Sequence, residues 1–206
     1  KFTVNGWTRQ EMFGADDACA ITTDNNNYNR PAVIGNMDQS VEMTTACFDS
    51  CEDCVDYAAL LHGSWSPIGM GVGPNQGDEG WWSYPRDGSR GCWEDDVFEF
   101  KADGTFTMDL GADTWLEGWQ GVASEGCGAP VAPHVSADHT YSFNASAMEL
   151  TVNGDGAYVV LAKAHNSGED GNSGGSIMYH VTSVTETEMI LDLNYGNWWR
   201  LYLKKN

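Results

Sequence analysis

Basic residues are scarce in this sequence. Its 206 residues include ten Lys and Arg against thirty Asp and Glu, which gives a formal net charge of -20. Such a field repels phosphate backbones and anionic lipid surfaces, so nucleic acid is excluded as a partner. The acidic residues are spread through turns, which is typical of a solvated surface. Calcium binding or life in salty water is the more specific alternative.

Long hydrophobic runs are missing as well. No stretch approaches the roughly 18 to 20 consecutive apolar residues that cross a bilayer, so no membrane span is expected. Motifs for nucleophilic catalysis, such as Gly-x-Ser-x-Gly or a Cys-His arrangement, do not stand out. The five histidines show no metal-ligand spacing.

Material for a hydrophobic core is plentiful. Hydrophobic residues make up 41% of the chain, and they include nine Trp, eight Tyr and seven Phe. The length suits one domain with an extension. A folded core is therefore expected, and disorder throughout the chain is not.

Alternating apolar and polar residues predict antiparallel hairpins. The clearest joins Val97–Phe100 to residues 105–110 through the turn Asp103-Gly104. Side chains in a strand repeat every two residues, which puts one set on the core face. This set is Phe98, Phe100, Phe106, Met108 and Leu110.

Further hairpins are predicted downstream. One joins residues 148–152 to 157–161, and another joins 177–184 to 189–193, before a last strand at 199–203. Successive hairpins indicate an antiparallel sheet. A helix of at most two turns is expected, within residues 53–61.

Two long segments and the N-terminal region lack this pattern. The glycine-rich segments 67–91 and 165–175 show no strand periodicity and are interpreted as loops, which often carry function. Residues 1–57 have few paired apolar positions and hold four of the six cysteines. We interpret residues 1–57 as an irregular arm or partial sheet, and residues 58–206 as the main domain.

Three segments carry a resemblance to a known family. Residues 61–65 (LHGSW), 91–106 (GCWEDDVFEFKADGTF) and 198–203 (WWRLYL) resemble the lipocalin-like domains of secreted and surface proteins of bacteria. Residues 157–169 (AYVVLAKAHNSGE) are similar to a segment of modules that accompany polysaccharide-degrading enzymes or bind glycans at the cell surface. The resemblance implies an all-β fold, an antiparallel lipocalin-like β-barrel or β-sandwich, with a glycan-binding accessory role.

Tryptophans are the leading candidates for ligand contact. Several lie in doublets or loops, and the flat indole ring matches the apolar face of a pyranose. In a strand doublet, one ring is expected in the core and the other in solvent. The candidate stacking residues are Trp81, Trp82, Trp115, Trp119 and Trp198.

Polar side chains near the first doublet are candidates for bonding sugar hydroxyls. They are Asn75, Gln76, Asp78, Glu79 and Arg86. For each tryptophan, core packing remains the simpler alternative.

Acidic side chains offer two candidate calcium sites. One is Asp95 and Asp96, and the other is Glu169 with Asp170 and Asn172 in a glycine-rich loop. Neither has a recognised ligand spacing, so turn hydrogen bonds and a solvated loop are the alternatives. Calcium is thus the one cofactor that the sequence suggests.

A glycoside hydrolase is the one enzyme class that the carboxylates suggest, because it uses two facing carboxyl groups. Asp95 and Asp96 are adjacent, so on a regular strand they point to opposite faces and cannot form that pair. An enzyme is therefore less favoured than a binding protein.

Six cysteines in a loop-rich chain favour disulfides, and so an extracellular or cell-surface location. We expect Cys92 to pair with Cys127, tying the first hairpin to the loop 115–128. The other four would staple the arm, in an order that stays open, and a zinc site is their alternative. They are Cys19, Cys47, Cys51 and Cys54.

Together these features predict non-catalytic binding of a polysaccharide outside the cell. The alternative is a structural subunit of a fibre, surface layer or virion. In that case the arm would pair with the sheet edge of another copy or of a neighbouring domain.

Overall fold

The computed structural model describes residues 55–85, 87–169 and 174–206, together with the backbone of four short strands nearer the N-terminus. These strands are β1 (Thr3–Val4), β2 (Arg9–Gln10), β3 (Ile21–Asp24) and β4 (Asn27–Asn29). β1 pairs with β2 and β3 with β4, both antiparallel. The chain divides into two units, Lys1–Asp56 and Tyr57–Asn206. The expected disulfides of the arm lie outside the described residues.

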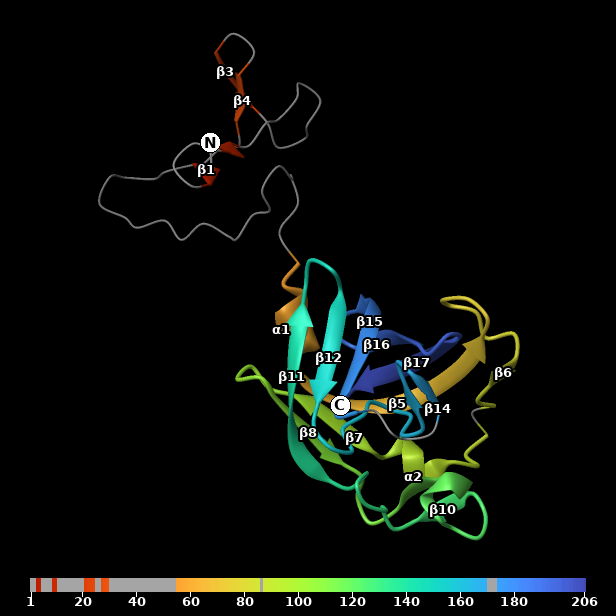
Figure 1. Ribbon diagram of the computed structural model, residues 1–206. Helices are drawn as coiled ribbons and strands as arrows, with labels where there is room; N and C mark the ends of the chain where they lie inside the picture. Colours follow the sequence, from red (N-terminus) through yellow and green to blue (C-terminus); the bar gives the residue numbers. More distant parts are fainter. Residues whose placement is uncertain are drawn as a thin grey trace. The chain divides into compact units, whose positions relative to one another are not determined.

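The second unit is a closed antiparallel β-barrel of eight strands. Each strand pairs with the next along the chain, and the last pairs back with the first (Figure 1). Closure removes the sheet edges and gives the up-and-down barrel typical of lipocalins. The expected all-β fold is confirmed as a barrel rather than a sandwich. The strands are β5 (Gly63–Gly73), β7 (Val97–Phe100), β8 (Thr105–Asp109), β11 (Ala137–Asn144), β12 (Glu149–Asn153), β15 (Ser176–Val184), β16 (Glu188–Asn194) and β17 (Trp198–Lys205).

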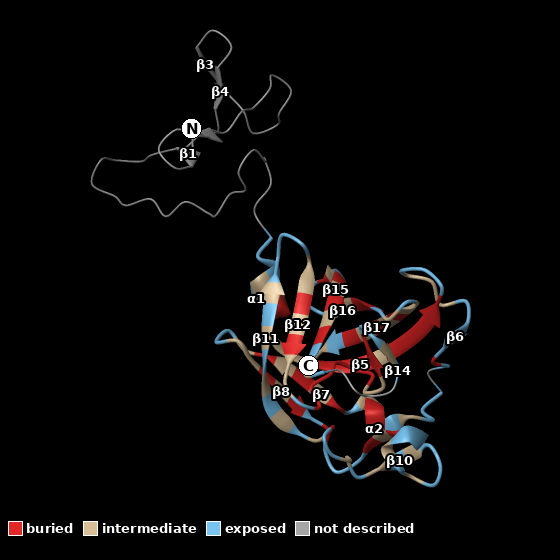
Figure 2. Ribbon diagram, viewed as in Figure 1, coloured by how far each residue is buried: buried red, intermediate tan, exposed pale blue. Residues whose placement is uncertain are grey.

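Every second side chain of a strand points inward, and these inward-facing side chains fill the barrel interior. The predicted hairpin is present as β7 and β8, with Phe98 opposite Met108 and Phe100 opposite Phe106. These four side chains are buried, as is Leu110, which confirms the predicted core face (Figure 2). The hairpin of β15 and β16 and the final strand β17 are also confirmed.

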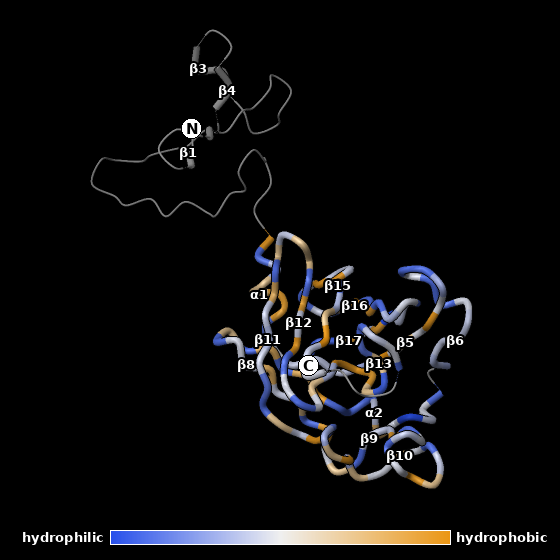
Figure 3. Tube along the Cα trace, in the orientation of Figure 1, coloured by the Kyte–Doolittle hydropathy of each residue, from blue (hydrophilic) through white to orange (hydrophobic). Residues whose placement is uncertain are grey.

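The prediction that residues 67–91 form a loop is wrong for the first part of that segment. Residues 67–73 belong to β5, whose beginning pairs with β7 and whose remainder pairs with β17. The loop after β5 is hydrophilic (Figure 3), and it packs closely on the strand at Gly71 and Gly73. These glycines interrupt the alternation of apolar and polar residues by which a strand is recognised. A Cβ at Gly71 would lie 2.5 Å from the Glu79 side chain, which would have to move. A Cβ at Gly73 would lie 2.5 Å from the backbone oxygen of Asp78, so only glycine fits there.

The predicted hairpin between residues 148–152 and 157–161 is also wrong. β12 pairs instead with β11 and β15, and residues 157–161 form no strand. All five of these apolar residues are buried, so the pattern is continuous rather than alternating. We call residues 157–161 the inner segment.

The inner segment packs on inward-facing side chains of the barrel. The Val159 amide donates a hydrogen bond to the Tyr179 hydroxyl, and the Tyr158 ring lies edge-on to Phe98. Val160 has a φ of 69°, an uncommon value for a β-branched residue. The indole of Trp93 donates to its carbonyl, at 2.7 Å. The barrel is therefore filled by its own chain rather than left hollow.

Short elements connect the barrel strands. β6 pairs with β5, β9 with β10, and β13 with β14. Among the described residues, no helix is long and apolar enough to cross a bilayer. The short helix expected within 53–61 is α1. The short elements are α1 (Tyr57–Leu61), β6 (Trp82–Ser83), α2 (Gly91–Glu94), β9 (Thr114–Leu116), the 3-10 helix η1 (Gly118–Gln120), β10 (Gly126–Gly128), β13 (Ala164–His165) and β14 (Gly168–Glu169).

Candidate ligand-binding site

A cavity of about 370 Å³ lies where β5 ends and β17 begins. We call it the tryptophan cavity. Its apolar and aromatic lining is Met70, Val72, Trp81, Trp82, Leu161, Tyr195 and Trp199. Its charged lining is Arg90, Glu117, Glu125, Lys163 and Glu169.

Strand register brings two of the tryptophans together. Val72 of β5 is paired with Trp82 of β6 on one side and with Trp199 of β17 on the other. The two rings meet edge-to-face, with centroids 6.0 Å apart. Aromatic pairs favour this arrangement, so the side of the cavity formed by Trp82 and Trp199 has a defined shape before any ligand binds.

The two tryptophan doublets differ in burial. In β17 the expected alternation holds: Trp199 is 5% exposed, and Trp198 lies half-buried beside His180. In the other doublet it fails, because Trp81 is 57% exposed and Trp82 is 39% exposed. β6 has only two residues and lies at the end of the sheet order, so no further strand covers it.

The guanidinium of Arg90 lies over two indole rings, those of Trp115 and Trp82. Its guanidinium carbon is 4.0 Å from the ring centroid of Trp115 and 5.5 Å from that of Trp82. Both distances are within the range of cation–π attraction. Burial lowers the pKa of Arg90 below its usual value, and the charge of Glu117 opposes this shift.

Lys163 supplies the second cation. Its ammonium lies 5.3 Å from the Trp199 ring centroid and 3.8 Å from one carboxylate oxygen of Glu117. The other oxygen of Glu117 is 4.0 Å from Arg90. Glu117 is also the N-cap residue of η1, where its backbone N–H donates to the Gln120 side chain and its backbone carbonyl accepts the Gln120 N–H, both at 2.9 Å.

The remaining carboxylates of the cavity are on its exposed side. Glu125 precedes β10 and Glu169 ends β14, and both are exposed. Glu169 accepts a hydrogen bond from the indole nitrogen of Trp199. Glu169 was a calcium candidate, whereas its proposed companions Asp170 and Asn172 lie outside the described residues.

The polar loop predicted to serve the first doublet contacts the barrel wall instead of the cavity. Glu79 accepts a hydrogen bond from the Tyr202 hydroxyl, and Gln76 bonds to the carboxylate of Asp192. Asn75 and Asp78 bond to each other through their backbones in the turn. None of these four lines the cavity. Arg86 lies outside the described residues.

Two other predicted tryptophans lie apart from the cavity lining. Trp119 of η1 is 39% exposed and meets the His134 ring edge-on, at 5.4 Å between centroids. Trp115 lies behind Arg90 with a buried indole nitrogen that bonds to no described residue. A ligand role for Trp115, Trp119 and Trp198 stays a prediction.

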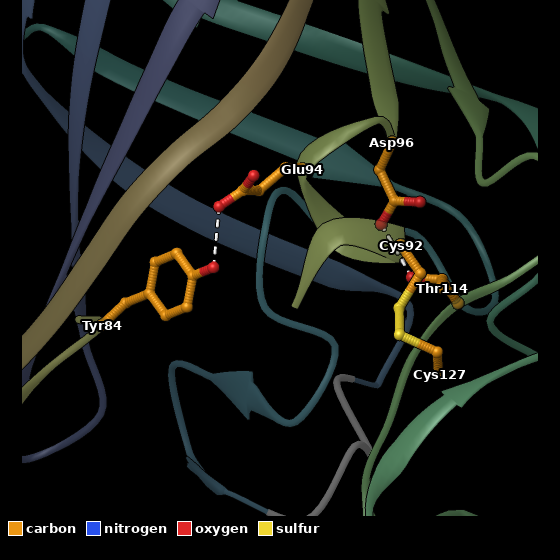
Figure 4. Close-up of a disulfide and its surroundings, with 6 residues drawn as sticks. All are labelled: Tyr84, Cys92, Glu94, Asp96, Thr114 and Cys127. Carbon is orange, nitrogen blue, oxygen red and sulfur yellow. Dashed lines mark hydrogen bonds between the residues drawn. A yellow bond between two sulfur atoms is a disulfide. The ribbon is translucent and has the colours of Figure 1, made fainter. Parts of the chain in front are cut away.

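Asp96 is the most unusual of the acidic candidates (Figure 4). It is fully buried and accepts a hydrogen bond of 2.7 Å from the Thr114 hydroxyl, while its other oxygen has no partner among the described residues. Burial raises its pKa to about 8. Its neighbour Asp95 is exposed, so the structure does not bring the two together as one site.

The disulfide between Cys92 and Cys127 is present, as predicted (Figure 4). It ties α2 to β10, and so ties the chain after Arg90 to the ribbon that follows Glu125. Within the described part of the chain, these two cysteines and Asp113 form the one group whose donor atoms could surround a metal ion. The disulfide removes both thiolates from that role.

Solved structures provide a comparison. A lipocalin-like protein from Bacteroides uniformis ATCC 8492 is 13% identical, with a TM-score of 0.38, over 71% of this chain and 99% of that chain. An uncharacterized protein from Bacteroides eggerthii DSM 20697 is 11% identical, with a TM-score of 0.36 and the same coverage. No protein-family model and no curated protein matches the sequence. The lipocalin-like topology follows from the strand pairing of the chain itself.

Sequence reasoning identified Trp81 and Trp82 but missed other lining residues. In the second doublet it chose Trp198, whereas Trp199 lines the cavity. The alternation of Trp199 with the core residues Leu201 and Leu203 was the available signal. No sequence signal marks Arg90, Glu117 and Lys163 as lining residues. They come from separate connections that only the closed barrel brings together.

Proposed function

We propose that the protein binds a carbohydrate without cleaving it, and that the tryptophan cavity is the binding site. The observation that carries the proposal is the exposure of Trp81 and Trp82 beside the buried ring of Trp199. Exposed indole faces suit the apolar face of a sugar ring, and the charged groups around them suit its hydroxyls.

The size of the cavity supports a small portion of a glycan as the ligand. Its volume of about 370 Å³ is at the lower end of the range for ligand pockets. Leu161 of the inner segment forms part of its lining, and the inner segment fills the barrel behind it. The ligand would therefore contact the end of the barrel rather than enter it, in contrast to a hollow lipocalin.

Binding is favoured over hydrolysis by the surroundings of Glu117, the most buried carboxylate of the cavity. A glycosidase needs two carboxyl groups that face each other across the scissile bond. Glu117 instead lies 4.0 Å from Arg90 and 3.8 Å from Lys163, so it is the counter-ion of two cations.

We further propose that the protein works outside the cell or at its surface, beside polysaccharide-degrading proteins. The disulfide supports an oxidising compartment. The alternative of a structural subunit depends on residues 1–57, most of which lie outside the described residues, and no observation favours it.

A glycan-array screen followed by titration of each hit tests the proposal. Tryptophan fluorescence is a direct readout, because a ligand stacked on the exposed rings changes their environment. Saturable quenching by one class of glycan, with a matching Kd from calorimetry, is the expected result. Silence of the full chain across neutral, acidic and amino-sugar glycans would overturn the proposal.

A further inference from the structure

Two of the scarce cations meet at the tryptophan cavity. The chain has ten Lys and Arg against thirty Asp and Glu, yet Arg90 and Lys163 both line this one cavity. Arg90 immediately precedes α2, and Lys163 follows the inner segment. The lining of the cavity thus holds two cations against three carboxylates, compared with one against three in the chain as a whole.

Both cations keep donors that no described residue accepts. In the part of the chain that the structure describes, neither the guanidinium of Arg90 nor the ammonium of Lys163 donates a hydrogen bond to another residue. Their distances to Glu117, 4.0 and 3.8 Å, exceed the range of about 2.7–3.2 Å for such bonds. Their side chains are 15% and 24% exposed, so the cavity is where a bonding partner can reach them.

Glu117 cannot satisfy both cations. Its backbone is fixed by two hydrogen bonds with Gln120 at the start of η1, and its single negative charge is shared between Arg90 and Lys163. Arg90, Lys163 and Glu117 together therefore have one excess positive charge. The guanidinium of Arg90 also lies over the rings of both Trp82 and Trp115, which pre-orients its planar fork.

We propose that the cavity prefers a sugar residue bearing an oxyanion, a carboxylate or a sulfate ester, and that the oxyanion binds between Arg90 and Lys163. This inference rests on the proposed function. An arginine fork and an ammonium together supply the charge-assisted hydrogen bonds that an oxyanion accepts.

The other charged residues of the cavity determine the orientation of the bound ligand. Glu125 and Glu169 are exposed, and would repel an oxyanion at the outer side while accepting bonds from sugar hydroxyls. The net charge of -20 opposes a polyanion at long range, but salt screens that field beyond about 8–10 Å. The preference therefore comes from contact within the cavity.

Matched ligands test the charge preference. The probes are a galacturonate tetrasaccharide and its methyl ester, a sulfated galactan tetrasaccharide and its desulfated form, and a chitosan tetrasaccharide. We expect an acidic probe to bind about tenfold or more tightly than its uncharged partner, by calorimetry with the full chain. The two acidic probes distinguish a carboxylate from a sulfate ester.

Variants of Lys163 locate the effect. Lys163→Met should remove most of the preference, and Lys163→Arg should retain it. Lys101→Met is the control, because it removes the same charge from an exposed pair with Glu99 outside the cavity. Unchanged melting temperatures would show that each variant is folded.

Three results would overturn the inference. They are equal affinity for a charged probe and its neutral partner, tightest binding of chitosan, or an acid preference that survives unchanged in Lys163→Met. Each leaves carbohydrate binding intact. Absence of binding by every probe here and by every glycan of the array would overturn the proposed function as well.

Discussion

Trp82 and Trp199 lie on opposite sides of Val72, with their ring centroids 6.0 Å apart and their planes at 70°. The barrel closure creates this relationship, because β5 is the strand that pairs with both β6 and β17. One ring is buried and supports the other, which is 39% exposed. A supported, partly exposed ring loses little freedom when a ligand stacks on it.

Replacing Trp82 by alanine should weaken glycan binding by about tenfold or more, since truncated tryptophans often cost about 2 kcal/mol or more at binding surfaces. The control is Tyr57→Ala, because Tyr57 is an aromatic residue with a similar exposed fraction, 37%, that lies outside the cavity. Calorimetric Kd values for both variants, with circular dichroism as a folding check, measure the difference. Equal losses in the two variants would contradict the assignment of the site.

The sequence predicts those parts of the fold that depend on local alternation. The hairpin of Phe98 and Phe106 is an example, because its alternation and its Asp103-Gly104 turn lie within a few residues. Gly71 shows where this fails: its missing side chain makes room for a loop that packs back, so the strand looks like a loop. In the inner segment, a continuous apolar run fits a buried strand and an interior segment equally well.

The site is less predictable than the fold. The doublet at Trp81 suggests exposed tryptophans, because nine tryptophans are more than one core of this size usually needs. Arg90 and Lys163 could not be predicted, since they come together only through the closed barrel and a disulfide. No local sequence pattern marks these two charged residues as parts of one site, because contacts between distant parts of the chain bring them together.

Replacing both Cys92 and Cys127 by alanine should lower the free energy of unfolding by about 3–4 kcal/mol, from the entropy of a loop that closes over a sequence separation of 35. Glycan affinity should also fall, because the link holds the chain after Arg90 against the ribbon next to Glu125. Urea unfolding and calorimetry measure the two effects. Unchanged stability would mean that packing alone holds α2 on β10.

Replacing Asp192 by alanine should destabilise the barrel by about 3–5 kcal/mol, because it leaves Arg200 without its partner at 2.8 Å. Glu99→Ala breaks the exposed pair with Lys101 and should cost less than about 1 kcal/mol. Urea unfolding compares them. A loss no larger in Asp192→Ala than in Glu99→Ala would contradict the prediction.

The same pair makes stability depend on acid. Burial would raise the pKa of Asp192, but hydrogen bonds from Arg200 and Thr182 outweigh it and hold the pKa below its usual range. The stabilising contribution is therefore present above the ordinary pKa of about 4 and is lost as the pH falls below it. Wild type should show this acid-side loss of stability more strongly than the Asp192→Ala variant.

Asp96 should produce the opposite pH dependence. Burial raises its pKa to about 8, so the folded state holds a proton that the unfolded state has released. Because the folded state binds more protons between about pH 4 and pH 8, stability falls as the pH rises through that interval. One proton limits the slope to about 1.4 kcal/mol per pH unit.

Asp96→Asn tests this, since an amide keeps the acceptor for the Thr114 hydroxyl and cannot ionise. Urea unfolding at pH 5 and pH 8 should show that the variant gains stability relative to wild type at the higher pH. Asp95→Asn, at the exposed neighbouring position, should show only a smaller gain, because it removes one of the like charges that help to raise the pKa of Asp96. If the difference between Asp96→Asn and wild type is the same at both pH values, the buried carboxyl does not titrate in this interval. The orphaned oxygen of Asp96 would then have to be stabilised by a group other than a proton, such as a buried water.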